Sequence, residues 1–134
     1  DLFYGEKSSN GNWMEAVPLG GDVNGKFNEG PLAFDKESGK LYFTRNNYIS
    51  NKIEKNKKSF NVLKIFEANI ENTSATIVGS LKLGNDEYSV GHPTLNSKGD
   101  VMYFIANLPW GYGGTDIYKS TKINRYNNKK FSVK

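Results

Sequence analysis

Carboxylates, a single histidine and two loop aromatics are the side chains of this 134-residue chain whose types and spacing could support chemistry. Two carboxylates that converge in a pocket can act as general acid and base. The nearest pairs by sequence are Asp22 with Glu29 and Asp86 with Glu87, all in loops rich in Gly and Asn. Because the sequence brings no nucleophile and base together near them, we interpret all four as surface charges.

His92 precedes Pro93 at the start of an expected strand. A catalytic histidine needs a serine and a carboxylate at convergent positions. The chain also lacks the Gly-x-Ser-x-Gly turn that carries a hydrolase nucleophile. We therefore expect His92 to brace the incoming loop through a hydrogen bond, and we expect no catalytic residue in the chain.

The composition limits the kinds of metal site that the chain can form, because it has no cysteine and only one histidine. Disulfides, thiolate zinc sites and His-rich centres are excluded. Asp116 could ligate calcium with Asn107 and Asp100, but the dense alternating carboxylates of a calcium loop are missing. We favour a structural role in which Asp116 accepts N–H groups from Gly113 and Gly114. No metal or cofactor is expected.

Trp110 and Tyr112 stand among glycines in a loop, and Asn107 precedes them. Loop aromatics can stack on sugars or anchor a protein partner. They can equally fill the gap between neighbouring sheets of a repeat protein, and the sequence leaves both roles open. All three residues are candidate partner contacts. Trp13 is expected to pack between units.

The net charge of +4 comes from 18 basic and 14 acidic residues, with lysines gathered at 52–58 and 122–134. Basic surface can attract anionic partners. Because aromatic platforms are not interleaved with these lysines, we expect solvated segments and no nucleic-acid partner. No run of 18 apolar residues exists, so a membrane-spanning segment is not expected.

The elements that position these residues come from a motif that occurs twice, at 28–46 and at 90–107. Each copy reads proline, short apolar run, polar turn closed by glycine, and Tyr-Phe strand ending in a small residue and Asn. The matched positions are Pro31 and Pro93, Gly39 and Gly99, Tyr42 and Tyr103, and Phe43 and Phe104. Repetition at this period predicts an array of similar units.

Strand signals dominate the chain, with expected strands at 2–4, 13–17, 31–34, 40–44, 60–70 and 75–83 and at matching positions in the second copy up to 130–133. Pro18 and the pair Gly20-Gly21 are expected to end the second strand. Asp35 can accept turn N–H groups, and Gly39 can close the hairpin with a positive φ. The return strand should place Leu41 and Phe43 on one face and Tyr42 and Thr44 on the other. Residues 45–59 read as a long polar loop.

Each unit is thus expected to supply four short antiparallel strands, which predicts an all-β fold built of β-propeller blades. The expected division is the end of one blade at 1–27, a second blade at 28–89 and a third at 90–134. Closed propellers have four to eight blades. We therefore expect a partial propeller within a longer protein.

The stretch HPTLNSKGDVMYFIANLPWGYGGTDIY resembles the WD40-like β-propeller repeat of bacterial envelope proteins. The segment from Gly111 to Tyr118 is similar to the version in OmpA-family lipoproteins of the Bacteroidota. In those proteins the propeller lies between a helical repeat region and a peptidoglycan-binding domain, and one group serves type IX secretion and gliding. The resemblance implies a periplasmic protein associated with the outer membrane. It also implies envelope-protein partners and peptidoglycan contact through a domain outside this chain.

Three functions remain open from the sequence. The first is a non-catalytic scaffold that presents loops to protein partners in the envelope. The second is a glycan- or peptidoglycan-binding module that uses Trp110, Tyr112 and Asn107. The third, a propeller domain of a hydrolase, requires a Ser–His–Asp domain elsewhere.

Overall fold

The computed structural model describes residues 1–49, 52–53, 60–125 and 128–132, and these form strands, turns and loops without a helix. The all-β prediction is therefore confirmed for the described part of the chain. The strands are β1 (Phe3–Tyr4), β2 (Val17–Pro18), β3 (Gly20–Gly21), β4 (Glu29–Asp35), β5 (Lys40–Asn46), β6 (Tyr48–Ile49), β7 (Lys52–Ile53), β8 (Leu63–Glu71), β9 (Ser74–Ser80), β10 (Val90–Leu95), β11 (Val101–Ala106), β12 (Asp116–Arg125) and β13 (Asn128–Ser132).

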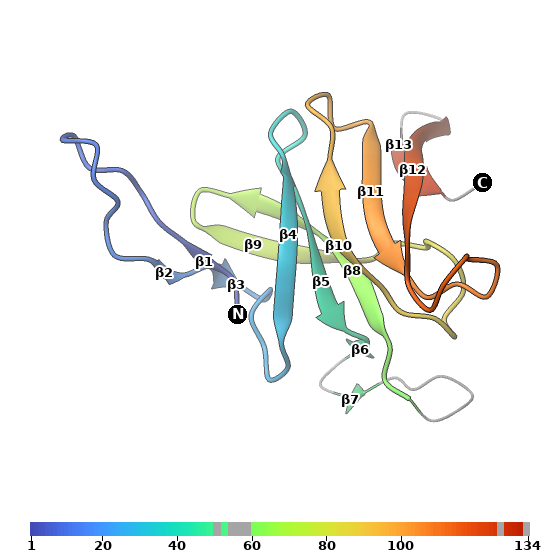
Figure 1. Cartoon of the computed structure of the whole chain (residues 1–134). Coiled ribbons are helices and arrows are strands. Elements are labelled where there is room, and N and C mark those ends of the chain that lie inside the picture. The colour runs from blue at the N-terminus through green and yellow to red at the C-terminus, as the bar shows by residue number, and fades with distance from the viewer. Residues whose placement is uncertain (50–51, 54–59, 126–127, 133–134) are drawn as a thin grey trace.

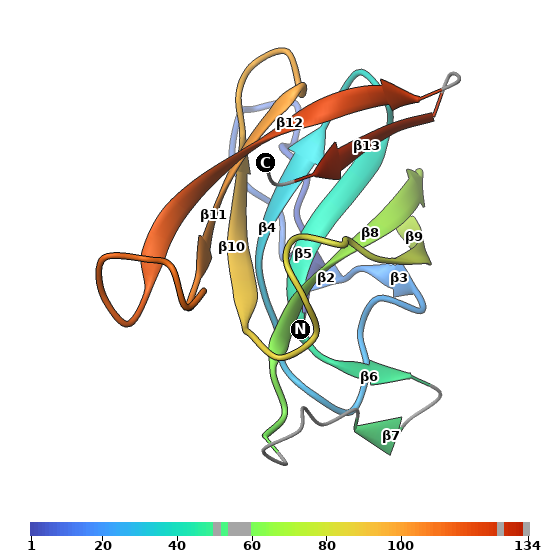
Figure 2. The same cartoon turned by 90° about the vertical axis from the view of Figure 1, so that its right-hand side faces the viewer.

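Two antiparallel meanders dominate the architecture (Figure 1). In the first, β4, β5, β8 and β9 pair in chain order, and β3 adds to the far edge of β9 in parallel. In the second, β10, β11, β12 and β13 pair in chain order. Strand β10 contacts β4, β5 and β8, so the second meander packs against the first (Figure 2).

The two copies of the sequence motif form equivalent hairpins, β4–β5 and β10–β11. In each hairpin the register shifts around the matched proline, between Glu29 and Leu32 in the first copy and between Gly91 and Thr94 in the second. A bulge leaves a backbone position unpaired, so the missing N–H of proline is tolerated there. The repeat in sequence is a repeat in structure.

Turn chemistry closes both hairpins as the sequence predicts. Asp35 Oδ1 accepts the Glu37 N–H at 3.2 Å, and Gly39 has a φ of 66°. In the second copy Asn96 Oδ1 accepts the Val101 N–H at 3.0 Å, and Gly99 has a φ of 65°. A side chain that accepts turn N–H groups together with a glycine at positive φ fixes the position of the reversal.

Two apolar clusters cover the two faces of the first meander. Side chains alternate between the faces along β5, as predicted, so neighbouring residues belong to different clusters. Tyr42 points into the cluster between the two meanders, whereas Leu41 and Phe43 point into the cluster on the opposite face. The buried members between the meanders are Tyr42, Ile65, Leu83, Val90, Met102, Phe104, Ala106, Leu108 and Phe131. Those of the opposite cluster are Leu2, Leu19, Val23, Leu41, Phe43, Phe66, Ala68 and Ala75.

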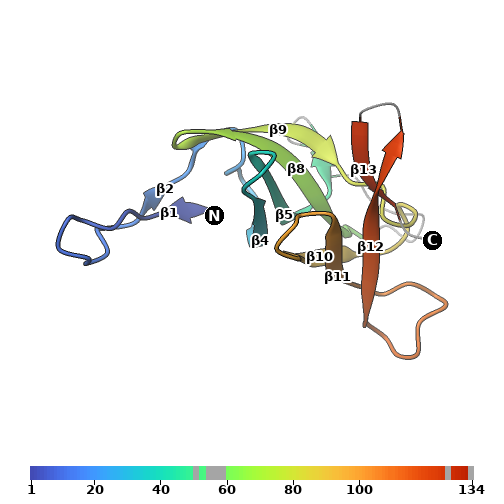
Figure 3. The same cartoon turned by 90° about the horizontal axis from the view of Figure 1, so that it is seen from above.

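The N-terminal region departs from the predicted strands. The expected strand at 13–17 is reduced to β2, which includes Pro18, and Trp13 lies in an arm with 71% of its surface exposed. Figure 3 shows this arm at the end of the molecule opposite β12 and β13. The expectation that Trp13 packs between units is therefore wrong. Proline is tolerated in β2 because that strand pairs on one side only.

We expected the pair Gly20-Gly21 to end the second strand. The two glycines instead form β3, which pairs with β9. Gly21 has a φ of 94°, and a Cβ there would clash with the backbone of Ala75. Only glycine permits this approach of the two backbones. The glycines therefore mark a close strand contact.

The predicted loop at 45–59 is also partly wrong. Arg45 and Asn46 continue β5, and β6 and β7 form a short antiparallel hairpin. Tyr48 anchors this hairpin because its ring is buried and lies 4.7 Å from that of Phe27. Positions 50–51 and 54–59 of the predicted loop lie outside the described residues.

Candidate functional site

The loop between β11 and β12 carries the aromatic pair that the sequence singled out. Trp110 is 62% exposed and Tyr112 is fully exposed. The loop is fixed below these rings: Leu108 is buried, and its carbonyl accepts the Gly111 N–H at 3.1 Å. The sequence left two roles open for these rings: contact with a partner, or filling a gap between sheets. Because both rings are exposed, they do not fill a gap between the described sheets.

Asp116 fixes the other end of this loop. Its Oδ2 accepts the Gly113 N–H at 3.1 Å, which is the contact expected from the sequence for the first of the two glycines. A Cβ at Gly111 would meet this carboxylate and lie 2.7 Å from the Tyr118 hydroxyl. The loop backbone therefore passes close to the start of β12, and the rings are held outward.

Asn107, the third candidate contact, has a structural task at the start of the loop. Its Oδ1 accepts the Ser89 N–H at 2.7 Å, and its own N–H donates to the Ser89 carbonyl at 3.3 Å. These bonds join the loops at the same end of β10 and β11. Asn107 therefore positions the aromatic loop.

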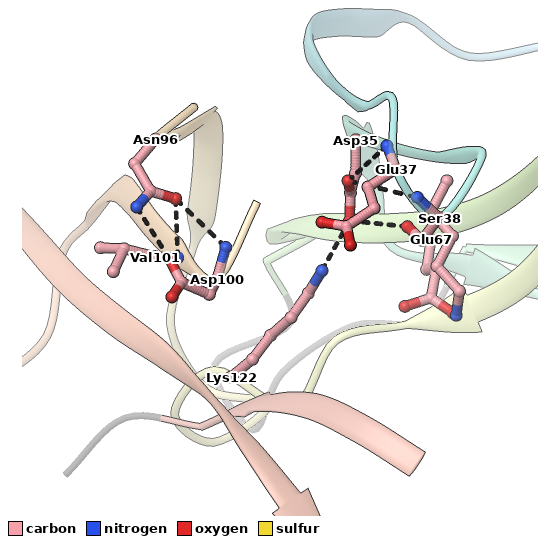
Figure 4. Close-up of polar contacts among 9 residues, drawn as sticks. Asp35, Glu37, Ser38, Glu67, Asn96, Asp100, Val101 and Lys122 are labelled. Atoms are coloured by element: carbon pink, nitrogen blue, oxygen red, sulfur yellow. Dashed lines mark hydrogen bonds and ion pairs between the residues drawn. The ribbon is translucent and has the colours of Figure 1, made fainter. Parts of the chain in front are cut away.

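Asp35 and Lys122 form an ion pair that joins the two meanders (Figure 4). The Nζ of Lys122 on β12 lies 2.6 Å from Oδ2 of Asp35, and their side chains are 9% and 5% exposed. The Ser38 hydroxyl donates to the same oxygen at 2.6 Å. Because both charges are buried, this pair fixes how the second meander sits on the first.

Opposing effects act on the Asp35 carboxyl. Burial raises its pKa, but the hydrogen bond and charge of Lys122, with the Ser38 hydroxyl and N–H, outweigh burial, and the pKa lies below its ordinary value. Lys122 Nζ also lies 5.2 Å from the centre of the Phe131 ring and 5.9 Å from that of Tyr42. Burial, followed by the nearby charges of Glu67 and Asp35, raises the pKa of Tyr42. The Asp35 carboxyl is thus ionised at neutral pH.

The two carboxylate pairs are not brought into a catalytic arrangement. Asp22 Oδ1 accepts the Ile77 N–H at 2.7 Å, and Asp86 pairs with Lys64 at 3.3 Å. Glu29 is buried, so its interpretation as a surface charge is wrong. The Tyr48 hydroxyl donates a hydrogen bond to Glu29 Oε1 at 3.4 Å, which gives the buried carboxylate one partner.

His92 braces the hairpin with its main chain. Its backbone N–H donates to Thr44 Oγ1 at 2.7 Å, with φ at 53°, while the imidazole lies at the surface. The expected bracing bond exists but does not use the side chain. Thr44 lies on β5, so this bond links the first meander to β10.

Of the calcium candidates, Asp100 is separated from Asp116 by the ladder of β11 and β12, while Asn107 lies at the Asp116 end. Asp116 pairs with Ala106 at one end, and Asp100 precedes Val101, which pairs with Thr121 at the other. Within the described residues no three His, Cys, Asp or Glu side chains come close enough to hold a metal ion.

Sequence reasoning missed Lys122, which it counted only as part of a basic end, and the buried group formed by Glu29, Arg45 and Tyr48. The signal was available in the alignment of the two copies. Arg45 pairs with Glu29 across β4 and β5, where the second copy pairs Ala106 with Val90. Arg45 stands three residues after Tyr42, where the second copy has Ala106 three residues after Tyr103, and this difference is visible without a structure.

Comparisons of the chain with models of protein families, with curated proteins and with solved structures find no match. None of the described residues belongs to a helix of the length and apolarity needed to cross a membrane.

Proposed function

We propose that this chain is a non-catalytic interaction module that binds a protein partner through the loop between β11 and β12. The exposure of Trp110 and Tyr112 on an anchored loop carries this proposal. Exposed aromatic residues held by a fixed backbone gain contact area on binding at low entropic cost. Within the described residues the candidate acids and His92 have separate structural positions, which favours binding over catalysis.

The scaffold for this loop is proposed to be a β-propeller whose blades are the two meanders. Each meander has four antiparallel strands in chain order, and one packs on the face of the other, as blades do. The Tyr42 and Ile65 face of the first meander is covered by the second. The matching face of the second carries Tyr103 and Ile117, which are 44% and 77% exposed, as on a blade that receives another neighbour.

A place in the bacterial envelope is proposed on the resemblance of residues 92–118 to repeats of envelope lipoproteins. A periplasmic location at the outer membrane, partners in a secretion or gliding complex, and a link to peptidoglycan through another domain follow from that resemblance. The exposed loop between β11 and β12 is the surface proposed for these partners.

The experiment is a pull-down from an envelope extract with the full chain and the variants Trp110→Ala and Tyr112→Ala. Loss of one partner with both variants supports the loop as the contact surface. Phe34→Ala, at an exposed aromatic on β4, is the matched control and should retain the partner. Retention of every partner by both loop variants would remove the loop from the proposal.

A glycan ligand is the second candidate, because two exposed rings two residues apart could stack on a sugar. Calorimetry with soluble cell-wall fragments separates the two functions. Heat that disappears with Trp110→Ala favours the glycan, and no heat with the full chain eliminates it.

A further inference from the structure

A cavity of about 560 Å³ lies on the first sheet beside the end of β5. The side chains in its wall that matter here are those of Asp22, Arg45, Asn47, Tyr48, Phe66 and Ser80. This wall combines aromatic surface with polar groups, which is the usual composition of a small-molecule site. The loop with Trp110 and Tyr112 belongs to the other meander, so this is a separate feature.

Arg45 is the unusual member of the wall, because its guanidinium is buried with few partners. The residue is 6% exposed, and its Cζ lies 3.9 Å from the centre of the Tyr48 ring and 4.5 Å from that of Phe66. One Nη donates to the Tyr48 carbonyl over a long 3.5 Å, and Nε has no hydrogen-bond partner among the described residues. A buried charge without hydrogen bonds is costly.

The Glu29 carboxylate, which is nearest to Arg45 in the strand ladder, does not neutralise the buried guanidinium through an ion pair. Glu29 pairs with Arg45 in backbone register, but the ion pairs of the described residues do not include the two side chains. Glu29 Oε1 accepts the long bond from Tyr48, and Oε2 has no partner in the described part of the chain. Both charges are therefore buried and incompletely satisfied.

The second meander builds the same kind of hairpin without these charges. Three residues after the matched tyrosine, where the first meander has Arg45 paired with Glu29, it has Ala106 paired with Val90, and both are 2% exposed. The same hairpin with the same bulge is therefore built from two apolar residues. Arg45 therefore stands at a ladder position where the second meander has a buried alanine.

We propose that this cavity binds a small anionic ligand through a carboxylate or phosphate group that pairs with the Arg45 guanidinium. Arginine offers planar, paired N–H donors that match these two groups, and the two aromatic rings hold that plane in place. Asp22 lies in the same wall. The rest of the ligand should therefore carry hydrogen-bond donors and no second negative charge.

The test uses the Nε–H signals of arginine in ¹H–¹⁵N spectra of the full chain, because the chain has only two arginines, Arg45 and Arg125. Acetate and inorganic phosphate are added separately as probes, with ionic strength held constant by sodium chloride. We expect the Arg45 signal to shift and saturate while the Arg125 signal stays. Saturation by acetate alone assigns a carboxylate ligand, and saturation by phosphate alone assigns a phosphate.

The control variant replaces the pair by that of the second meander, Glu29→Val with Arg45→Ala. It removes both buried charges together, so it should fold, and the backbone amides of Gly79 and Ser80 should no longer shift with the probe. Arg45→Lys is the second variant; it keeps the charge but loses the planar fork, and it should weaken binding by about tenfold or more. No saturable shift of Arg45 with either probe, or unchanged shifts of Gly79 in the double variant, overturns the proposal.

Discussion

Asp35 and Asn96 occupy the same turn position in the two copies, yet only Asp35 has a charged partner. Both side chains accept turn N–H groups, so the hairpin alone does not require the charge. The second oxygen of Asp35 receives Lys122 from the other meander, 87 positions along the chain. An aspartate in a turn was readable from the sequence, but its partner was not, because nothing local connects these residues.

Asp35→Asn should destabilise the protein by about 3 kcal/mol or more, because it leaves the buried Lys122 ammonium without a counter-charge. Urea unfolding at neutral pH measures the change. Asp100→Asn is the matched control: Asp100 is exposed in the second turn, and its loss should change the free energy of unfolding by about 0.5 kcal/mol or less. Equal stability of the Asp35 variant and the wild type would show that the pair is not formed.

The stabilisation by Asp35 should also depend on pH. Its pKa is lower in the folded protein than the value of about 3.9 expected for the unfolded chain. The contribution is therefore complete above that value and is lost as pH falls through the folded pKa. The stability gap between wild type and Asp35→Asn should narrow below about pH 4. A gap that stays constant down to acid pH would contradict the ion pair.

At the scale of elements, the hairpins could be predicted and several short strands could not. The turns at 35–39 and 96–99 are set by a side chain and a glycine within a few residues, which makes them visible in sequence. Strand β3 depends on pairing with β9, more than 50 residues away, and β6 depends on burying Tyr48. Such contacts are set by tertiary packing, which local patterns do not report.

Gly39→Ala should cost about 1–2 kcal/mol, because alanine resists the positive φ of this turn. The cost is purely conformational, since a Cβ there would come no closer than 3.9 Å to its nearest neighbour. Gly114→Ala has open space and no positive φ, so it should change stability by about 0.5 kcal/mol or less. Thermal unfolding of the two variants provides the comparison, and equal midpoints would argue against the turn.

Asp116→Ala should loosen the aromatic loop without unfolding the sheet. Loss of the bond to the Gly113 N–H should cost about 1 kcal/mol of local stability. Amide hydrogen exchange should then accelerate at Gly113 while Phe104, in the adjoining β11, keeps its protection. An unchanged rate at Gly113 would show that another contact holds the loop.

For the whole molecule, the repeat predicted the sheets but not which faces are covered. The two matching tyrosines differ in burial: Tyr42 is buried between the meanders, whereas Tyr103 is exposed on the outer face of the second meander. The loop that carries Trp110 and Tyr112 could be predicted from its glycines, although the exposure of the two rings could not. Arg45 was missed because its strand was read by itself and not against the second copy, which has Ala106 at that position.

The face-to-face packing of the two repeats is the claim on which the loop, the ion pair and the proposed propeller all depend. Nuclear Overhauser spectroscopy tests it through the rings of Tyr42 and Phe131, whose centres lie 5.5 Å apart across the interface. We expect cross-peaks between these two rings in the full chain. Their absence, together with Hα–Hα cross-peaks that pair β4 with β10 in one continuous sheet, would contradict the account.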